Sequence, residues 1–297
     1  MSHDHTNEIK ENRFVLALIL TGLIFLAEFI GGFWTGSLAL LSDSAHVFMD
    51  AFALGLSYLA LRAAKLPADD NHTYGFHRMQ VLAALINGAT LFLIAFEIMR
   101  QAWDRFRNPE PVLAGPMLVI AVIGLAVNLI VAFTLSRHDH DDLNTRSAFL
   151  HVLGDALASV GVIAVGVILL FVDWTWLDPL VGVLIGLLIL FSSGRVLKES
   201  VHILAEGMPE GMTATVIAEN MQKVPGVSQV HDLHVWTVAP GYIALSAHVT
   251  IDDQSIRQAA EVMSALKETL DKSFNIQHTT IQFECDNCGQ GLVACRE

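Results

Sequence analysis

Long apolar segments alternate with short polar ones over the first two thirds of the chain. Six of these segments have about the 18–20 residues that an α-helix needs to cross a lipid bilayer. They lie at about 14–34, 38–61, 81–99, 116–135, 148–171 and 179–196. This pattern predicts an α-helical membrane protein in which residues 14–206 form a bundle of six transmembrane helices.

From about residue 207 the long apolar segments end. Hydrophobic and polar residues then alternate over short helices and strands, as in a water-exposed domain. The expected elements are, in order, a helix at 213–224, strands at 227–238 and 242–251, a helix at 255–271 and a strand at 279–284. Ala239-Pro240-Gly241 is a turn signal between the first two strands. We expect residues 207–297 to form a small α+β domain, a sheet with helices on one face. Because its core is modest, we expect it to pair with a second copy.

The two ends of the chain carry possible metal ligands. Residues 1–13 are polar and contain His3 and His5, which predicts a cytoplasmic tail, either disordered or able to collect metal ions. All three cysteines, Cys285, Cys288 and Cys295, lie in the last 13 residues. This placement gives no disulfide framework for the body of the protein. It is typical of a reduced compartment or of a metal-binding tail.

The composition argues against two classes of protein. Hydrophobic residues make up 53% of the chain and charged residues only 16%, unlike an ordinary water-soluble domain. The formal net charge of −13 argues against a nucleic-acid partner, because nucleic acids select for basic surfaces. We therefore expect membrane lipid as the surroundings and no nucleic acid as a partner.

Basic residues are distributed unevenly between alternate connections, which predicts the orientation in the membrane. The segments before the first span, between spans two and three, between spans four and five, and after span six contain nine of them. These nine are Lys10, Arg13, Arg62, Lys65, Arg78, Arg137, Arg146, Arg195 and Lys198. The opposite connections contain only Arg100, Arg105 and Arg107. Both termini are therefore expected in the cytoplasm.

Two apolar segments each carry a histidine followed four residues later by an aspartate. His46 and Asp50 lie in the second segment, and His151 and Asp155 lie in the fifth. Residues four apart share one face of an α-helix, roughly 5–6 Å apart at Cβ. Two such helices side by side would present two imidazoles and two carboxylates, a tetrahedral ligand set suited to zinc. Ionisable groups at membrane depth are costly, so the pattern indicates a functional metal site.

Other polar residues in the apolar segments have less definite roles. Asp43 shares a helical stripe with His46 and Asp50, either at the mouth of the site or at the turn before the second span. Asp178-Pro179 is expected to begin the sixth span, because proline suits the first helical turn. The remaining polar residues are expected to bond between helices or to line a hydrated pathway; they are Glu28, Asn87, Glu97 and Asn128.

Several motifs together resemble the cation diffusion facilitator family. They are the run at 36–46 (GSLALLSDSAH), the two His-x-x-x-Asp pairs, HTYG at 72–75, Asp178-Pro179, HVW at 234–236 and TIQ at 280–282. The chain is similar to the zinc-exporting branch, which includes bacterial zinc/cadmium efflux proteins and vertebrate zinc transporters of vesicles. The resemblance implies a homodimeric zinc/proton antiporter with six spans and a cytoplasmic metallochaperone-like domain, located in the bacterial inner membrane.

The resemblance carries the family's transport ligands onto His46, Asp50, His151 and Asp155. Family members with aspartate in place of the first histidine are less selective among metals. His46 is therefore expected to favour zinc, with cadmium as a second substrate. Vesicular relatives often have a long His-rich loop between spans four and five, which here is reduced to two histidines, His138 and His140. This difference argues against metal capture by that loop.

The resemblance also implies metal sites outside the bundle. In the 62–78 loop, Asp70, His72 and His77 could hold a second ion, or the HTYG segment could merely shape a turn. In the C-terminal tail, Cys285 and Cys288, with His278, have zinc-ligand spacing. A single CxxC supplies only half of a tetrahedral site. Candidates for the other ligands are His3 of the partner subunit and His5 of the partner subunit.

A third implied site lies on the strands of the C-terminal domain. Alternation along a strand puts Asp232, His234 and Trp236 on one face of the sheet and His231 on the other. We therefore expect His234 to join His248 and Glu284 in a site with two nitrogen ligands and one oxygen ligand.

Metal binding to such ligands is coupled to protons. It requires neutral imidazoles and ionised carboxylates, so it releases protons, and an unperturbed histidine pKa of about 6.5 places this exchange near cellular pH. No GxxxxGK[ST] phosphate-binding loop is present, so we expect the proton gradient to drive efflux. Two alternatives stay open. An intramembrane metalloenzyme would need an open coordination position, which four protein ligands do not leave, and a zinc sensor that does not transport is compatible with the same site.

Overall fold

In the computed structural model, the described backbone covers residues 2–136, 143–285 and 291–292. The side chains of residues 2–18, 50, 131–136 and 143–155 lie outside the description. The chain divides into two compact units. One contains Met1–Leu56 and Ile86–Arg195, and the other contains Ser57–Leu85 and Val196–Glu297. The second unit therefore holds both the C-terminal domain and the connection between the second and third apolar segments.

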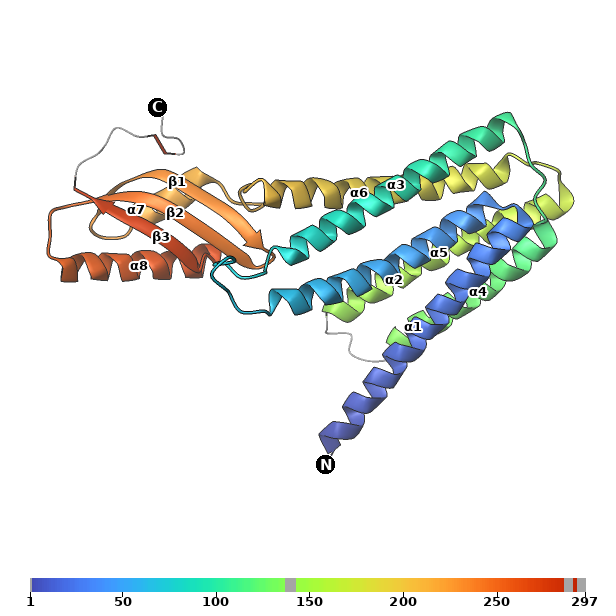
Figure 1. Ribbon diagram of the computed structural model, residues 1–297, viewed down its shortest axis with the longest axis horizontal. Helices are drawn as coiled ribbons and strands as arrows, with labels where there is room; N and C mark the ends of the chain where they lie inside the picture. The colour runs from blue at the N-terminus through green and yellow to red at the C-terminus, as the bar shows by residue number, and fades with distance from the viewer. Residues whose placement is uncertain (1, 137–142, 286–290, 293–297) are drawn as a thin grey trace. The chain divides into compact units, whose positions relative to one another are not determined.

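Each predicted apolar segment lies within one of six helices (Figure 1). They are α1 (Ser2–Thr35), α2 (Leu38–Ala64), α3 (Met79–Arg107), α4 (Ala114–Ser136), α5 (Leu143–Phe171) and α6 (Leu177–Leu204). Among the residues that the structure describes, α2, α3 and α6 are long and apolar enough to cross a membrane. The described apolar stretches of α1, α4 and α5 are shorter, at Ile19–Thr35, Ala114–Ile130 and Ala156–Phe171.

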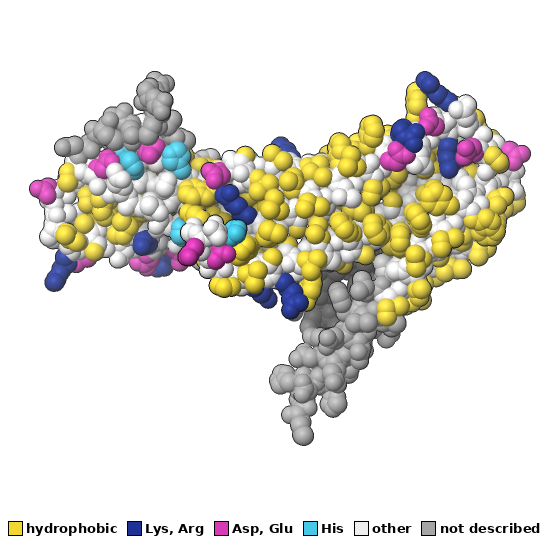
Figure 2. All heavy atoms as spheres, viewed as in Figure 1, with side chains coloured by type: hydrophobic (Ala, Val, Ile, Leu, Met, Phe, Trp, Pro, Cys, Tyr) yellow, Lys and Arg dark blue, Asp and Glu magenta, His cyan; other side chains and the backbone are white. Residues whose placement is uncertain are grey.

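The apolar helices expose hydrophobic side chains and bury polar ones. Leu93, Leu188 and Phe191 are 67%, 71% and 70% exposed. Figure 2 shows hydrophobic side chains covering much of the helical surface. Asp43 and Ser44, in contrast, are buried. Such a surface suits a bilayer, because lipid chains are as apolar as leucine, and it leaves buried polar groups to find partners inside the protein.

The C-terminal domain has the predicted order of elements, α-β-β-α-β. They are α7 (Ala214–Gln222), β1 (Val227–Ala239), β2 (Tyr242–Ile251), α8 (Ile256–Phe274) and β3 (His278–Glu284). The strands lie in the order β1-β2-β3, with β1 and β2 antiparallel and β2 and β3 parallel. Parallel neighbours need a crossover connection, and α8 provides it.

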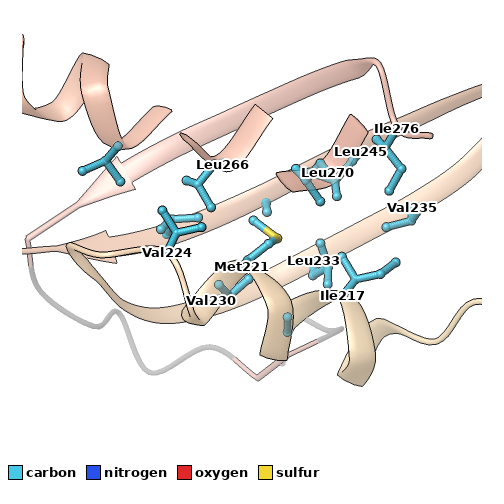
Figure 3. Packing of buried hydrophobic residues seen from close by; sticks show 14 of the residues in the cluster. Ile217, Met221, Val224, Val230, Leu233, Val235, Leu245, Leu266, Leu270 and Ile276 are labelled. Atoms are coloured by element: carbon cyan, nitrogen blue, oxygen red, sulfur yellow. The ribbon is translucent and has the colours of Figure 1, made fainter. Parts of the chain in front are cut away.

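One hydrophobic core joins both helices of this domain to the sheet (Figure 3). α7 contributes Ile217 and Met221, and α8 contributes Val262, Leu266 and Leu270. The residues from α8 recur every four positions, as expected of an amphipathic helix. Both helices therefore cover the same face of the sheet. The predicted fold class, apolar membrane helices followed by a small α+β domain, is confirmed.

Candidate metal sites

A buried hydrogen bond joins the two helices that carry the His-x-x-x-Asp pairs. The hydroxyl of Ser159 on α5 donates to Oδ2 of Asp43 on α2, at 3.1 Å. Both residues are buried. His46 is half-buried, one turn along α2 from Asp43. The side chain of Asp50 lies outside the described residues, as do those of His151 and Asp155.

This contact sets the register between α2 and α5. The two helices run in opposite directions (Figure 1). At 1.5 Å per residue, His46 and Asp50 follow Asp43 by about 4.5 and 10.5 Å along α2. Asp155 and His151 precede Ser159 by about 6 and 12 Å along α5. The two motif backbones therefore lie at matching levels, on helices that meet at Asp43 and Ser159.

A second set of possible ligands lies on the sheet of the C-terminal domain. One donor atom each from His231, His248 and Glu284 lies within 4.8 Å of the others, and this is the only such cluster among the residues that the structure describes. Nε2 of His231 is 3.1 Å from Oε2 of Glu284, and Nδ1 of His248 is 3.0 Å from Oε1. Two imidazole nitrogens and a carboxylate suit zinc, with one tetrahedral position left for another ligand.

The cluster contains His231 where we predicted His234, because the assumed alternation along β1 is wrong. His231 pairs with His248, and His234 pairs with Ser246. Three steps along β1 thus match two along β2, which is a β-bulge. Paired residues point to the same face of a sheet, so the bulge puts His231 and His234 on one face. Asp232 within the bulge has φ of +48°, a left-handed conformation that aspartate tolerates better than most residues.

His234 lies next to the cluster and is connected to it by an acidic side chain. Nε2 of His234 is 3.0 Å from Oδ1 of Asp232, and Nε2 of His248 is 3.7 Å from Oδ2 of the same carboxylate. Asp232 therefore bridges the histidine that we predicted as a ligand and one that belongs to the cluster. No feature of the sequence other than an aspartate in mid-strand indicates the bulge.

The described part of the C-terminal tail returns to this bulge. The amide of Asp232 donates to the carbonyl of Gly291 at 3.1 Å, and the amide of Leu233 donates to that of Leu292 at 2.8 Å. Leu292 also packs against the domain core. Two amides that a bulge leaves unpaired in the sheet are thus satisfied by the tail.

The structure does not bring the predicted tail ligands together. His278 begins β3, where its ring lies 5.3 Å from the ring of Tyr74 and 5.9 Å from that of Tyr242. Cys285 follows the other end of the same strand and is exposed. Seven residues of strand separate them by about 23 Å. Cys288 lies outside the described residues.

Two of the three predicted loop ligands, His72 and His77, have separate partners. The ring of His72 contacts Asp69, with Nδ1 3.0 Å from Oδ1, and not Asp70. The ring of His77 meets that of Tyr242 edge-on, with centroids 5.3 Å apart. Within the described residues, His72 and His77 therefore contact different partners, and the loop forms no ligand cluster.

Comparison with known proteins covers both parts of the chain. Residues 14–205 match the family model described as the cation efflux transmembrane domain. Residues 209–285 match the model described as the cytoplasmic domain of cation efflux proteins. The two matches are separated by residues 206–208, which follow the end of α6.

Curated relatives match the chain over nearly its whole length. The metal cation efflux system protein CzcD of Cupriavidus metallidurans is 40% identical over 293 residues, 99% of this chain and 92% of that protein. A cadmium, cobalt and zinc/H(+)-K(+) antiporter of Bacillus subtilis is 38% identical, over 96% of this chain and 93% of its own. The zinc transporter ZitB of Pectobacterium atrosepticum is also 38% identical, over 97% and 89%.

Proposed function

Because the chain belongs to the cation diffusion facilitator family, in its zinc-transporting branch, we propose that it exports zinc in exchange for protons. It is a metal cation efflux transporter of bacterial membranes and not an enzyme. The proposed transport site consists of His46, Asp50, His151 and Asp155. We further propose six membrane spans with both termini in the cytoplasm, following the distribution of basic residues.

The observation that carries this proposal is the buried hydrogen bond between Ser159 and Asp43. It supports the proposal because it joins α2 to α5 in a register in which the backbones of the two His-x-x-x-Asp pairs lie at matching levels. Two imidazoles and two carboxylates then meet the tetrahedral preference of zinc without any further ligand. A fully coordinated ion has no position for a reacting water molecule, which favours transport over hydrolysis.

Proton coupling follows from the chemistry of these ligands. Imidazoles bind metal only when neutral and carboxylates only when ionised, so zinc entry displaces protons and proton return displaces zinc. The name of the Bacillus subtilis relative, which includes H(+) and three metals, supports both proton exchange and cadmium as a second substrate. Alternating exposure of the site to the two sides of the membrane would complete the cycle.

The cluster of His231, His248 and Glu284 is proposed as a second, regulatory zinc site in the cytoplasmic domain. Zinc would bind His231 and His248 through neutral nitrogens and would replace the histidine contacts of Glu284. We propose that the protein is a homodimer, since a domain of this size gains core by pairing. Zinc in this cluster would then bias how the two copies pack.

The test is zinc uptake into proteoliposomes under an imposed pH gradient, with purified full-length protein. We expect wild-type protein to accumulate zinc, and Asp50→Ala and Asp155→Ala to accumulate none. Asp253→Ala is the matched control, because Asp253 is exposed in the connection between β2 and α8. An enzyme or a sensor would give no flux in the wild type. Unchanged flux in both aspartate variants would overturn the proposed site.

A further inference from the structure

The start of α2 is capped by a carboxylate from α6. Asp178 lies in the first turn of α6 and is completely buried. Its Oδ1 accepts from the hydroxyl of Ser37 at 2.5 Å and from the amide of Ala39 at 3.3 Å. Its Oδ2 accepts from the amide of Leu38 at 2.6 Å. The first amides of a helix have no partner within it, so Asp178 satisfies them from another helix.

An arginine from α3 completes the same cluster. A guanidinium nitrogen of Arg105 lies 3.5 Å from Oδ2 of Asp178 and donates to the carbonyl of Gly36. Gly36 forms the turn between α1 and α2 with φ of +70°, where a side chain would be strained. Both carboxylate oxygens of Asp178 are thus occupied, which leaves none for a metal ion. The turn that begins α2 is therefore hydrogen-bonded both to Arg105 of α3 and to Asp178 of α6.

Close packing along α6 reinforces this hold. Gly182 lies one turn after Asp178, and a Cβ there would meet Cγ of Leu38 at 3.0 Å and the hydroxyl of Ser42 at 3.5 Å. One further turn along, a Cβ at Gly186 would meet Cγ2 of Ile98 on α3 at 3.2 Å. The first turns of α6 therefore pack closely against α2 at Gly182 and against α3 at Gly186, where a methyl group would fit only if its neighbours shifted.

We propose that Asp178 is a positioning residue for the transport site, and that it acts through α2. The helix is continuous from Leu38 to Ala64, so His46 follows the capped turn by about 12 Å without a break. The cap fixes the axial position of α2, and with it the distance of His46 and Asp50 from their partners on α5. This inference rests on the proposed function.

Metal selectivity distinguishes positioning from simple stability. Zinc accepts nitrogen and oxygen ligands at about 2.0–2.2 Å, whereas the larger cadmium ion requires longer bonds. A displacement of α2 therefore changes the fit of the two ions unequally. Loss of folded protein lowers the transport of both ions by the same factor and leaves KM unchanged.

The experiment measures kcat and KM for zinc and for cadmium with full-length protein in proteoliposomes. In Asp178→Asn, an amide group would face the backbone amides of α2, and we expect kcat/KM for zinc to fall by about 100-fold, the cost of misplacing reacting groups by about 1 Å. We expect the zinc-to-cadmium ratio to fall with it. Gly182→Ala adds a methyl group against Leu38 in the first turn of α2 without changing charge. It should also lower the zinc-to-cadmium ratio of kcat/KM.

Asp173→Asn is the control, since it makes the same replacement at an exposed position before α6 and should leave both kinetic constants unchanged. If Asp178→Asn fails to fold, Gly182→Ala and Ser37→Ala carry the test. Unchanged KM and an unchanged metal ratio in the folded variants would overturn the positioning role. The proposed site fails separately, if Asp50→Ala and Asp155→Ala still transport zinc.

Discussion

The two proposed metal sites of this chain use similar ligands on different secondary structure. In the bundle, His46 and Asp50 share a helix face, as do His151 and Asp155, because a helix repeats every 3.6 residues. In the cytoplasmic domain, the distance along the strand from His231 to His234 does not tell which face each residue occupies. One extra residue in the bulge reverses every later position along β1.

The surroundings explain why the strand contains an irregularity of this kind and the helices keep their period. Within a bilayer no water is available for a freed amide, so backbone groups must be satisfied inside the protein. The sheet has other acceptors, and the amides of Asp232 and Leu233 bond to the returning tail at Gly291 and Leu292. Residue spacing is therefore better evidence for ligands on α2 and α5 than for ligands on β1.

The largest expected effect separates transport from regulation. We expect Asp155→Ala to abolish zinc flux, because the proposed bundle site would lose one of its four ligands. Glu284→Ala should retain flux and change only its dependence on cytoplasmic zinc. The measurement is the initial rate of zinc uptake across a range of zinc concentrations. Complete loss of flux in Glu284→Ala would mean that the cytoplasmic cluster belongs to the transport pathway.

The second prediction contrasts the apolar side chains of the two regions. Leu270 is completely buried in the core of the cytoplasmic domain, and we expect Leu270→Ala to lower its free energy of unfolding by about 2–5 kcal/mol. Ile256 is 91% exposed on the same helix. Ile256→Ala should change the free energy of unfolding by less than about 0.5 kcal/mol. Urea denaturation of residues 207–297 measures both.

The same replacement in the bundle should behave differently. Leu188 is 71% exposed on α6, where lipid would surround it, so Leu188→Ala leaves no cavity and should keep full transport. A loss of transport in this variant would mean that protein, and not lipid, covers that face of α6.

The sequence predicted the helices and strands well, but it did not predict the contacts between distant segments or the irregularity in β1. Six apolar segments gave six helices, and the α-β-β-α-β order was confirmed, because both follow from hydrophobic periodicity. The cap that Asp178 provides to α2 joins residues about 140 positions apart, and no local period contains that information. The bulge at Asp232 and the return of the tail depend in the same way on contacts between distant segments.

The third prediction tests the bulge directly. We expect His231→Ala to weaken zinc binding to the cytoplasmic cluster by at least about 10–100-fold, the range found when even an indirect partner of a metal is removed. His234→Ala should weaken it less, since His234 reaches the cluster only through Asp232. Zinc titration in an Asp50→Ala, Asp155→Ala background isolates this site. A larger effect of His234→Ala would instead support the original prediction, in which regular strand alternation makes His234 the ligand.

The smallest expected effect concerns the 62–78 loop, where neither the helical nor the strand period applies. Oδ1 of Asp69 accepts from the amides of Asn71 at 2.9 Å and His72 at 2.6 Å. Burial acts to raise the pKa of Asp69, but its hydrogen bonds with His72 and Asn71 outweigh this and hold the pKa below its ordinary value of 3.8. The ionised carboxylate therefore stabilises the folded loop. That contribution is complete above pH 3.8 and is lost as the pH falls through the lower folded-state pKa.

Hydrogen exchange of the Asn71 and His72 amides measures this contribution. We expect Asp69→Asn to speed exchange near neutral pH by about two- to fivefold, the effect of one weakened hydrogen bond. Asp70→Asn is the matched control and should not change the rate, because in the described structure His72 bonds to Asp69. Once intrinsic rates are corrected, the difference between wild type and Asp69→Asn should shrink as the pH falls below 3.8. A larger effect of Asp70→Asn would favour the ligand set predicted from the sequence, since Asp70 and not Asp69 would then hold the loop together.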